Sequence, residues 1–216
     1  MIKKIKQVVW NILIKLKIGG AVQLFLASGL RDDGWFESFN TKRSIDKNGN
    51  PVPWCTYPFI KFLEPRLKKD FIVFEYGSGN STLWYAERVG EITAVENDLE
   101  WYKNISSTMP SNAEVIYCEL KYDGDYCRQV TKHNKKYNII IIDGRDRNNC
   151  VKNSINHLTI DGIIVYDNTQ LTEYASSIEF ILQNGFKRLD FNGLLPVVAH
   201  NNTTTIFYRN ENCLNI

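Results

Sequence analysis

Several stretches of four consecutive apolar residues are directly followed by an acid, and three of these stretches consist mainly of Ile, Val and Phe. These three lie at residues 71–74, 139–142 and 163–166. A strand that is apolar on both faces belongs inside a parallel sheet that helices cover on both sides. A β-prone run at 91–95 also ends at an acid, and residues 147–158 have a helical composition. The pattern therefore predicts an α/β fold in which strands and helices alternate.

The last part of the chain departs from this pattern. Residues 185–191 and 203–209 are two β-prone runs of alternating polarity, joined by a short polar connection. Such a pair predicts an antiparallel hairpin.

A glycine-containing turn follows the first apolar run. Gly77 and Gly79 are spaced one apart, and a helix is predicted to follow them. Glycines let the backbone approach a ligand closely, because they lack Cβ and tolerate positive φ. In an open α/β sheet, ligands bind at the carboxyl ends of the strands beside such a turn. The residues that we expect to bind a ligand here are Glu75, Gly77, Ser78, Gly79, Asn80 and Ser81.

Two classes of ligand use this geometry, and the turn favours one of them. A dinucleotide-binding turn carries a third glycine, but Thr82 stands at that position. Glu75 would repel a pyrophosphate, whereas it suits a cationic or zwitterionic ligand. The alternative is a glycine turn that binds no ligand.

Glu96, at the end of the run at 91–95, adds a second indication of an adenosine ligand. It lies 17 residues after Gly79. A carboxylate at this place can accept hydrogen bonds from both hydroxyl groups of a ribose. NAD and an adenosyl cofactor both offer that diol, so Glu96 does not choose between them. A solvated acid at a strand end is the alternative.

The turn from Glu75 to Gly79 resembles motif I, E/D-x-G-x-G, of the class I S-adenosylmethionine-dependent methyltransferases. The order of elements over residues 55–210 is also similar to that family. The resemblance implies a Rossmann-like sheet of seven mostly parallel strands with a C-terminal antiparallel hairpin and flanking helices. It implies S-adenosylmethionine as the cofactor, with the adenine near the loop after the third strand, where Glu119 is our candidate.

Acids also end the predicted fourth and fifth strands, whose tips are neighbours in such a sheet. Asp143 and the pair Asp167–Asn168 offer oxygen ligands to Mg²⁺ or Mn²⁺. This placement resembles the magnesium site of catechol-type O-methyltransferases, in which the cation would lower the pKa of a substrate hydroxyl. The lysine base of those enzymes is missing, because Asp146 stands in its place. Asp143 is our catalytic candidate; the alternative is that Asp143 and Asp167 contact only the cofactor amine and loop amides.

The residues around Asp143 also suggest an acceptor. Arg145 and Arg147 can bind a carboxylate or phosphate, as in a uronic acid or a phosphorylated sugar. A salt bridge to Asp143 or Asp146 is the alternative. His200, in the connection before the last strand, is a second candidate for a catalytic base. Four short motifs look like those of bacterial methyltransferase-domain proteins associated with surface-glycan synthesis; they lie at residues 53–58, 74–82, 143–150 and 185–188.

The N-terminal part differs from the rest, and we divide the chain into residues 1–54 and a methyltransferase domain at 55–216. Residues 1–18 carry five lysines and no acid, with apolar residues at helical spacing. This amphipathic helix is expected to lie on an anionic membrane surface, to pack on its own domain, or to form an oligomer interface. In the irregular stretch 32–58 we expect Trp54 and Tyr57 to form a lid over the cofactor, and Trp35 and Phe36 to fill the edge of the core.

Composition sets limits on the function. A net charge of +2 is too small to indicate a protein that binds nucleic acid through a large basic surface. The five cysteines are scattered and predict neither a zinc motif nor a disulfide framework. Reduced thiols are typical of a cytoplasmic protein, which the N-terminal helix could hold at the inner membrane surface.

The function that the sequence predicts is methyl transfer from S-adenosylmethionine to an oxygen of a carbohydrate or another small, polar acceptor, acidic acceptors included. Two alternatives remain open at this point. One is a non-catalytic subunit that binds an S-adenosyl ligand on the same fold. The other is a nicotinamide oxidoreductase, against which Thr82 and Glu75 argue.

Overall fold

The computed structural model describes residues 2–216, and their side chains from Lys3 onward. Its strands form one seven-stranded sheet in the order β3-β2-β1-β4-β5-β7-β6. The first five strands are parallel, and β7 pairs antiparallel with both β5 and β6. The predicted sheet with its C-terminal antiparallel hairpin is therefore confirmed. The strands are β1 (Ile72–Tyr76), β2 (Glu91–Glu96), β3 (Ala113–Tyr117), β4 (Tyr137–Ile142), β5 (Leu158–Asp167), β6 (Lys187–Gly193) and β7 (Asn202–Tyr208).

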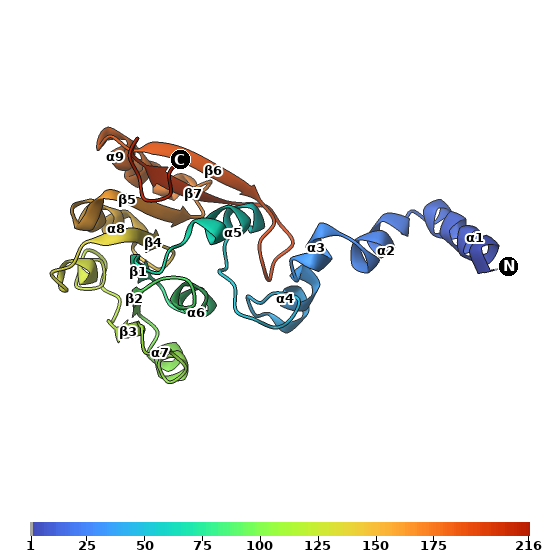
Figure 1. Ribbon diagram of the computed structural model, residues 1–216, viewed down its shortest axis with the longest axis horizontal. Helices are drawn as coiled ribbons and strands as arrows, with labels where there is room; N and C mark the ends of the chain where they lie inside the picture. The colour runs from blue at the N-terminus through green and yellow to red at the C-terminus, as the bar shows by residue number, and fades with distance from the viewer. Residues whose placement is uncertain (1) are drawn as a thin grey trace.

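Helices cover the two faces of this sheet (Figure 1). The α-helices are α1 (Ile2–Lys15), α2 (Gly19–Leu26), α3 (Gly29–Asp32), α4 (Trp35–Thr41), α5 (Tyr57–Leu63), α6 (Asn80–Ala86), α7 (Leu99–Ser106), α8 (Arg147–Ser154) and α9 (Ala175–Gln183). Four short 3-10 helices complete the chain: η1 (Glu64–Arg66), η2 (Gln129–Thr131), η3 (Ile155–His157) and η4 (Thr172–Tyr174).

Two hydrophobic cores lie on opposite faces of the sheet, because side chains alternate along each strand. Ile139 and Ile141 of β4 pack with helices α5 and α6. Ile140 and Ile142 belong to the second core, with residues of α8 and α9. All four side chains are almost wholly buried. This explains why the run at 139–142 is apolar at every position.

The N-terminal part is more helical than we expected. Residues 35–41 form α4 inside the stretch that was expected to be irregular. Trp35 packs against the core as predicted, whereas Phe36 contacts Trp35 and Phe25 of α2. The turn after α4 is closed by Asp46, whose carboxylate accepts hydrogen bonds from the backbone N–H groups of Asn48 and Asn50.

Helices α1 and α2 extend away from the sheet (Figure 1). Lys17 has a left-handed backbone (φ 61°) at the bend between them. The helix predicted at 1–18 therefore ends at Lys15, and it does not pack on its own domain, which removes one of its three predicted roles. Among the described residues, none of the helices has the length and apolar character that crossing a membrane requires.

Candidate functional site

The glycine turn lies where the tips of three parallel strands meet. Gly77 has a positive φ of 99°, and its N–H donates to the carbonyl of Val95 on β2 over 2.9 Å. A Cβ at Gly77 would stand 3.4 Å from the carbonyl oxygen of Asp143, at the end of β4. A larger residue is therefore strained here by conformation and crowded by its neighbour. The turn is held against both flanking strands.

Gly79 borders open space. A Cβ built on it meets only one neighbour within 4 Å, a ring carbon of Trp101 at 3.7 Å, which is an ordinary contact. The backbone of Gly79 is extended, so the conformation does not demand glycine. The space beside Gly79 is not filled by other residues of the protein, as we expect of a ligand-binding turn, which we call the cradle.

Thr82, which replaces the third glycine of a dinucleotide turn, ties the loop to the acid beneath it. Its hydroxyl accepts from the N–H of Gly79 over 3.0 Å and donates to Oε2 of Glu75 over 2.6 Å. Glu75 is only 1 % exposed. Burial raises the pKa of Glu75 to about 8, although hydrogen bonds from Ser81 and Thr82 oppose the rise. Glu75 thus lies beneath the loop and is connected to Gly79 through the hydroxyl of Thr82. Its predicted role toward a ligand stays a prediction.

Glu96 presents a fixed carboxylate at the edge of the cradle. Its Oε1 accepts from the N–H groups of Asn97 and Asp98, over 2.7 and 2.8 Å. Its Oε2 accepts from the hydroxyl of Ser78 over 2.8 Å. The loop and the end of β2 are therefore joined through one carboxylate. Glu96 is 7 % exposed, and its contact with a ribose hydroxyl stays a prediction.

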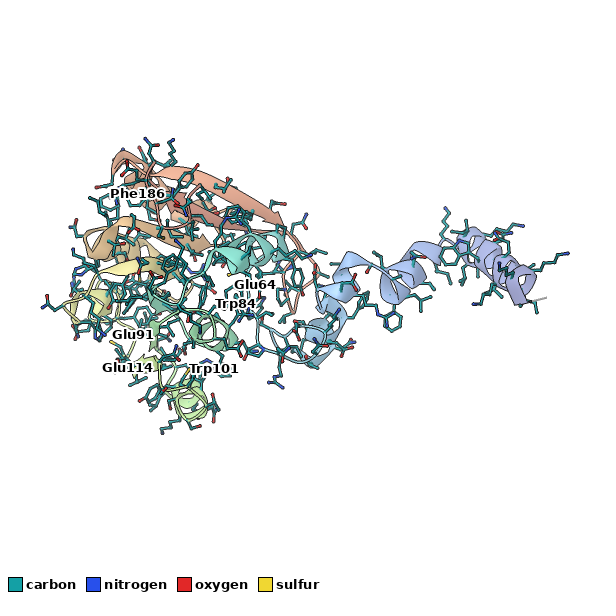
Figure 2. All side chains as sticks on the ribbon, in the orientation of Figure 1. Glu64, Trp84, Glu91, Trp101, Glu114 and Phe186 are labelled. Atoms are coloured by element: carbon teal, nitrogen blue, oxygen red, sulfur yellow. The ribbon has the colours of Figure 1, made fainter. Side chains whose placement is uncertain are left out.

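Trp101 belongs to this cradle, and the sequence reasoning missed it. Its indole N–H donates to the carbonyl of Ser78 over 2.9 Å, and the side chain is 46 % exposed. Figure 2 shows it on the side of α7 toward α6. Asp98 caps α7 by accepting from the N–H of Trp101 over 2.9 Å. The sequence pattern that could have revealed it is an aromatic residue three positions after Asp98, an acid that caps a helix close to the end of β2.

The segment after β3 reaches the same edge of the sheet. The N–H of Cys118 donates to the carbonyl of Glu96 over 2.8 Å, so Glu119 follows within one residue of this contact. Glu119 is exposed. Its role toward the adenine stays a prediction.

A buried arginine occupies the place where we predicted a metal ion. Each N–H of the Arg147 guanidinium has a protein acceptor, on Asp143, Gly144, Asp167 or Asn168. The Nη2–Oδ1 distance to Asp143 is 2.9 Å. The carboxylate of Asp167 points elsewhere, to Thr204 and Asn202. The oxygens of Asp143, Asp167 and Asn168 therefore do not converge on one empty point.

Two predictions are corrected by this arrangement. The expected Mg²⁺ or Mn²⁺ site is not supported, because Arg147 already forms an ion pair with Asp143, the first of the predicted metal ligands. Among the described residues, no group of His, Cys, Asp and Glu is arranged to hold a metal ion. Arg147 is also not a substrate-binding residue, because all five of its N–H groups are used within the protein. The alternative role that we named for it, a salt bridge to Asp143, is the one observed.

The two acids of this cluster, Asp143 and Asp167, both have a pKa above the ordinary value of an aspartate. Burial raises the pKa of Asp143, and the charge of Arg147 opposes the rise. Burial, together with the charge of Asp143, raises the pKa of Asp167 to about 7. Oδ2 of Asp143 has no hydrogen bond to the described residues, and the side chain is 22 % exposed. Asp143 therefore keeps one accessible oxygen for a cofactor amine or an acceptor.

Asp146, which replaces the lysine of the catechol enzymes, holds a loop. Its Oδ2 accepts from the N–H of Asp123 and its Oδ1 from the side chain of Asn149, both over 2.8 Å. Arg145 is exposed, and its side chain forms no recorded ion pair within the described chain. His200 is exposed in the β6–β7 connection, two residues before Asn202.

Residues 35–58 form a cap that is fastened to both sides of the strand tips. The side chain of Asn80 donates to the carbonyl of Ser44 over 2.7 Å, which ties the cap to the glycine turn. Trp35 and Ser38 bond the backbone of Val198 and Val197 in the β6–β7 connection. The Ser44 hydroxyl is buried without a recorded partner, which fits a polar group bound beside the turn.

The two predicted lid residues lie in different surroundings. Trp54 is 49 % exposed, so it is free to contact a ligand. Tyr57 begins α5, and its side chain is buried in the core rather than exposed like that of Trp54. Whether either contacts a cofactor stays a prediction.

Comparison with solved structures assigns this fold. The chain is similar to an rRNA methylase from Streptococcus thermophilus, with 14 % identity, a TM-score of 0.53, and coverage of 70 % of this chain and 96 % of that one. It is similar to a precorrin-6y C5,15-methyltransferase from Geobacter metallireducens, with 13 % identity, a TM-score of 0.56, and coverage of 70 % and 88 %. It is also similar to a methyltransferase-like protein from Silicibacter pomeroyi, with 18 % identity, a TM-score of 0.52, and coverage of 74 % and 90 %.

The chain has the class I methyltransferase fold. A protein of Streptococcus mutans with this fold, at 13 % identity and a TM-score of 0.50, was solved in complex with SAH and matches 68 % of this chain and 94 % of its own. No family model matches the chain, and no curated protein matches it in sequence.

Proposed function

We propose that this protein transfers a methyl group from S-adenosylmethionine to an oxygen of a small, polar acceptor. One observation carries the proposal: the open space at Gly79 lies beside the fixed carboxylate of Glu96 and the exposed indole of Trp101. That combination suits an adenosine with a free ribose diol. Thr82 takes the place of the glycine that a nicotinamide cofactor would need, which argues against the oxidoreductase alternative.

The residues that would hold the cofactor divide into three groups. The turn 77–81 would border the methionine end, Glu96 would accept from the ribose, and Trp101 and Glu119 would lie near the base. Bound S-adenosylmethionine supplies a methyl group on a positively charged sulfur, and its transfer requires an acceptor oxygen in line with that bond. The cap at residues 35–58 would exclude water from this space, and we propose residues 1–54 as a part of the chain separate from the domain at 55–216.

Acceptor chemistry is inferred from the side of β4 and β5. Arg145 is an exposed cation beside Asp143, which favours an acceptor with a carboxylate or phosphate. A sugar acid of the surface-glycan kind meets this description. The hydroxyl proton of such an acceptor would pass to Oδ2 of Asp143, or to His200 if the β6–β7 connection moves inward. Arg147 fixes the position of Asp143 and replaces a metal ion as the neutralising charge.

The test supplies S-adenosylmethionine labelled on its methyl group, with acceptors that differ only in charge. Galacturonic acid and galactose form such a pair. We expect transfer to the acidic sugar, with a KM that rises about tenfold in Arg145→Ala, while the neutral sugar is unaffected by that substitution. Asp143→Asn should lower kcat on the acidic sugar.

Two results would contradict the proposal in different ways. Binding of S-adenosylhomocysteine without transfer to any acceptor would favour the non-catalytic subunit. Transfer that EDTA abolishes and Mg²⁺ restores would contradict the role given to Arg147.

A further inference from the structure

The projecting helices α1 and α2 concentrate both positive charge and exposed apolar surface. We call residues 2–26 the arm. The arm carries five lysines, no arginine and no acid, a net charge of +5. The whole chain has 26 basic and 24 acidic residues, so the other 191 residues have 21 and 24 and a net charge of −3. The charge is therefore segregated.

Exposed apolar side chains are concentrated in the same place. Ten large hydrophobic residues between Ile5 and Leu26 are exposed, whereas only eight are exposed from residue 27 to the C-terminus. Figure 2 shows the side chains of α1 pointing outward, with no part of the sheet domain beside them. An apolar surface of this kind marks an interaction site.

The two properties are separated around α1. Ile5, Val9, Ile12 and Leu16 follow one another at intervals of four, three and four residues and share one face. Lys4 and Lys15 lie on one border of that face, and Lys6 on the other. Lysine stems at such borders can lie along an apolar surface while the ammonium groups stay in water.

Helix α2 continues the apolar surface beyond the bend. Leu24, Phe25 and Leu26 are 46 %, 58 % and 55 % exposed. Phe25 also packs edge-on against Phe36 of α4, with ring centroids 5.3 Å apart. This contact joins the arm to the cap at residues 35–58.

We propose that the arm binds the surface of an anionic lipid bilayer, with the apolar face of α1 and the end of α2 inserted between the lipids. Amphipathic helices with lysines on the polar face bind membranes in this way. The inference rests on the arm alone and is independent of the methyl-transfer proposal. Through Phe25 and Phe36, the bound arm would hold the capped site next to the lipid headgroups.

A second copy of the chain fits the arm less well. Two α1 helices packed on their apolar faces would bring their bordering lysines together. On the sheet domain, Leu171 and Leu182 line one cavity whose wall also contains Glu179 and Arg188, and other exposed hydrophobic residues, such as Ile160 and Leu99, lie on separate elements. A lipid surface satisfies the charge and the apolar face together.

The experiment is sedimentation of the full chain with vesicles. Vesicles of phosphatidylcholine mixed with phosphatidylglycerol are compared with vesicles of phosphatidylcholine alone. We expect binding to the mixed vesicles only, weakened by added salt. The double variant Val9→Gln/Ile12→Gln should bind the mixed vesicles about tenfold more weakly or worse, because burying each of these side chains contributes a large part of that factor.

Ile14 provides the matched control. It is 54 % exposed, close to the 50 % of Val9 and of Ile12, but lies on the opposite side of α1. Ile14→Gln should bind the vesicles as the unaltered protein does, and an unchanged thermal midpoint would show that all variants are folded.

Three results would overturn the proposal. One is equal binding of the double variant and the unaltered protein. The second is equal binding to both kinds of vesicle. The third is a dimer in analytical ultracentrifugation that Val9→Gln/Ile12→Gln dissociates, in a protein that does not sediment with either vesicle.

Discussion

The two halves of the strand-tip site differ in how much of their bonding capacity the protein itself uses. On the side of β1 and β2, Gly79 borders open space and Oε2 of Glu96 accepts a single hydrogen bond, from Ser78. On the side of β4 and β5, each N–H of Arg147 is already bonded within the chain. The first half is the one that we propose for the cofactor. In the second half the buried charges neutralise one another, and we propose that Arg145 and one oxygen of Asp143 contact the acceptor.

The largest effect on this comparison is expected at Gly79. Gly79→Leu would fill the open space, so calorimetry should detect no binding of S-adenosylhomocysteine. The fold should survive, because the first carbon of the new side chain meets only Trp101, at an ordinary distance. Gly29→Leu is the control, since a Cβ at Gly29 also meets open space, but in α3. Equal binding by both variants would show that the cradle is elsewhere.

On the other side, Arg147 should matter for stability. Arg147→Met would leave Asp143 buried without its partner, which should destabilise the protein by about 3 kcal/mol in urea unfolding. Arg145→Met, at an exposed position two residues away, should stay within about 0.5 kcal/mol. The loss should shrink at low pH, where Asp143 is protonated in both states. Similar losses for the two variants would mean that the buried ion-pair cluster is not what stabilises this half.

Glu96→Ala tests the ribose contact. The free energy of binding of S-adenosylhomocysteine should weaken by roughly 2–3 kcal/mol, as expected for a pair of charge-assisted hydrogen bonds. Glu100→Ala, on the exposed side of α7, should bind as the unaltered protein does. A dissociation constant that Glu96→Ala leaves unchanged would place the carboxylate outside the cofactor site.

The smallest effect is expected from a substitution of Glu75, and this effect on the free energy of unfolding depends on pH. The pKa of this acid in the folded state is raised to about 8 from an ordinary 4.5, so the folded protein holds a proton that the unfolded chain releases. The stability that comes from this proton is complete below about pH 4.5 and is lost as the pH rises through about 8.

Glu75→Gln has no charge to lose over this range. Between pH 6 and pH 9 the variant should therefore gain more than about 1 kcal/mol relative to the unaltered protein, the equivalent of one pKa unit. Urea unfolding at the two pH values measures the difference. A constant difference between the two proteins would mean that Glu75 is ionised throughout.

Local patterns made the first half predictable. The apolar run, the two glycines and the acid at position 96 are adjacent or nearly so in the sequence, and the strands that they imply pack as expected. Trp101 was missed because its place depends on where α7 starts. The register of β1 and β2 then brings Ser78 to its indole.

The second half depended on distant contacts. A sequence with Asp143, Asp167 and Asn168 at strand tips is compatible with a metal site or with an arginine in its place. The choice is made by the first turn of α8, which brings the guanidinium of Arg147 to the carbonyl of Asp167, 20 residues away. Thr204 then turns the carboxylate of Asp167 aside from 37 residues away. Periodicity contains no information about either contact.

The most direct test of the central claim is a calorimetric titration of the full chain with S-adenosylhomocysteine and, separately, with NAD. We predict that S-adenosylhomocysteine binds at one site and that NAD gives no binding heat, because Thr82 closes the turn that a dinucleotide would need. Binding of NAD without binding of S-adenosylhomocysteine would contradict the account.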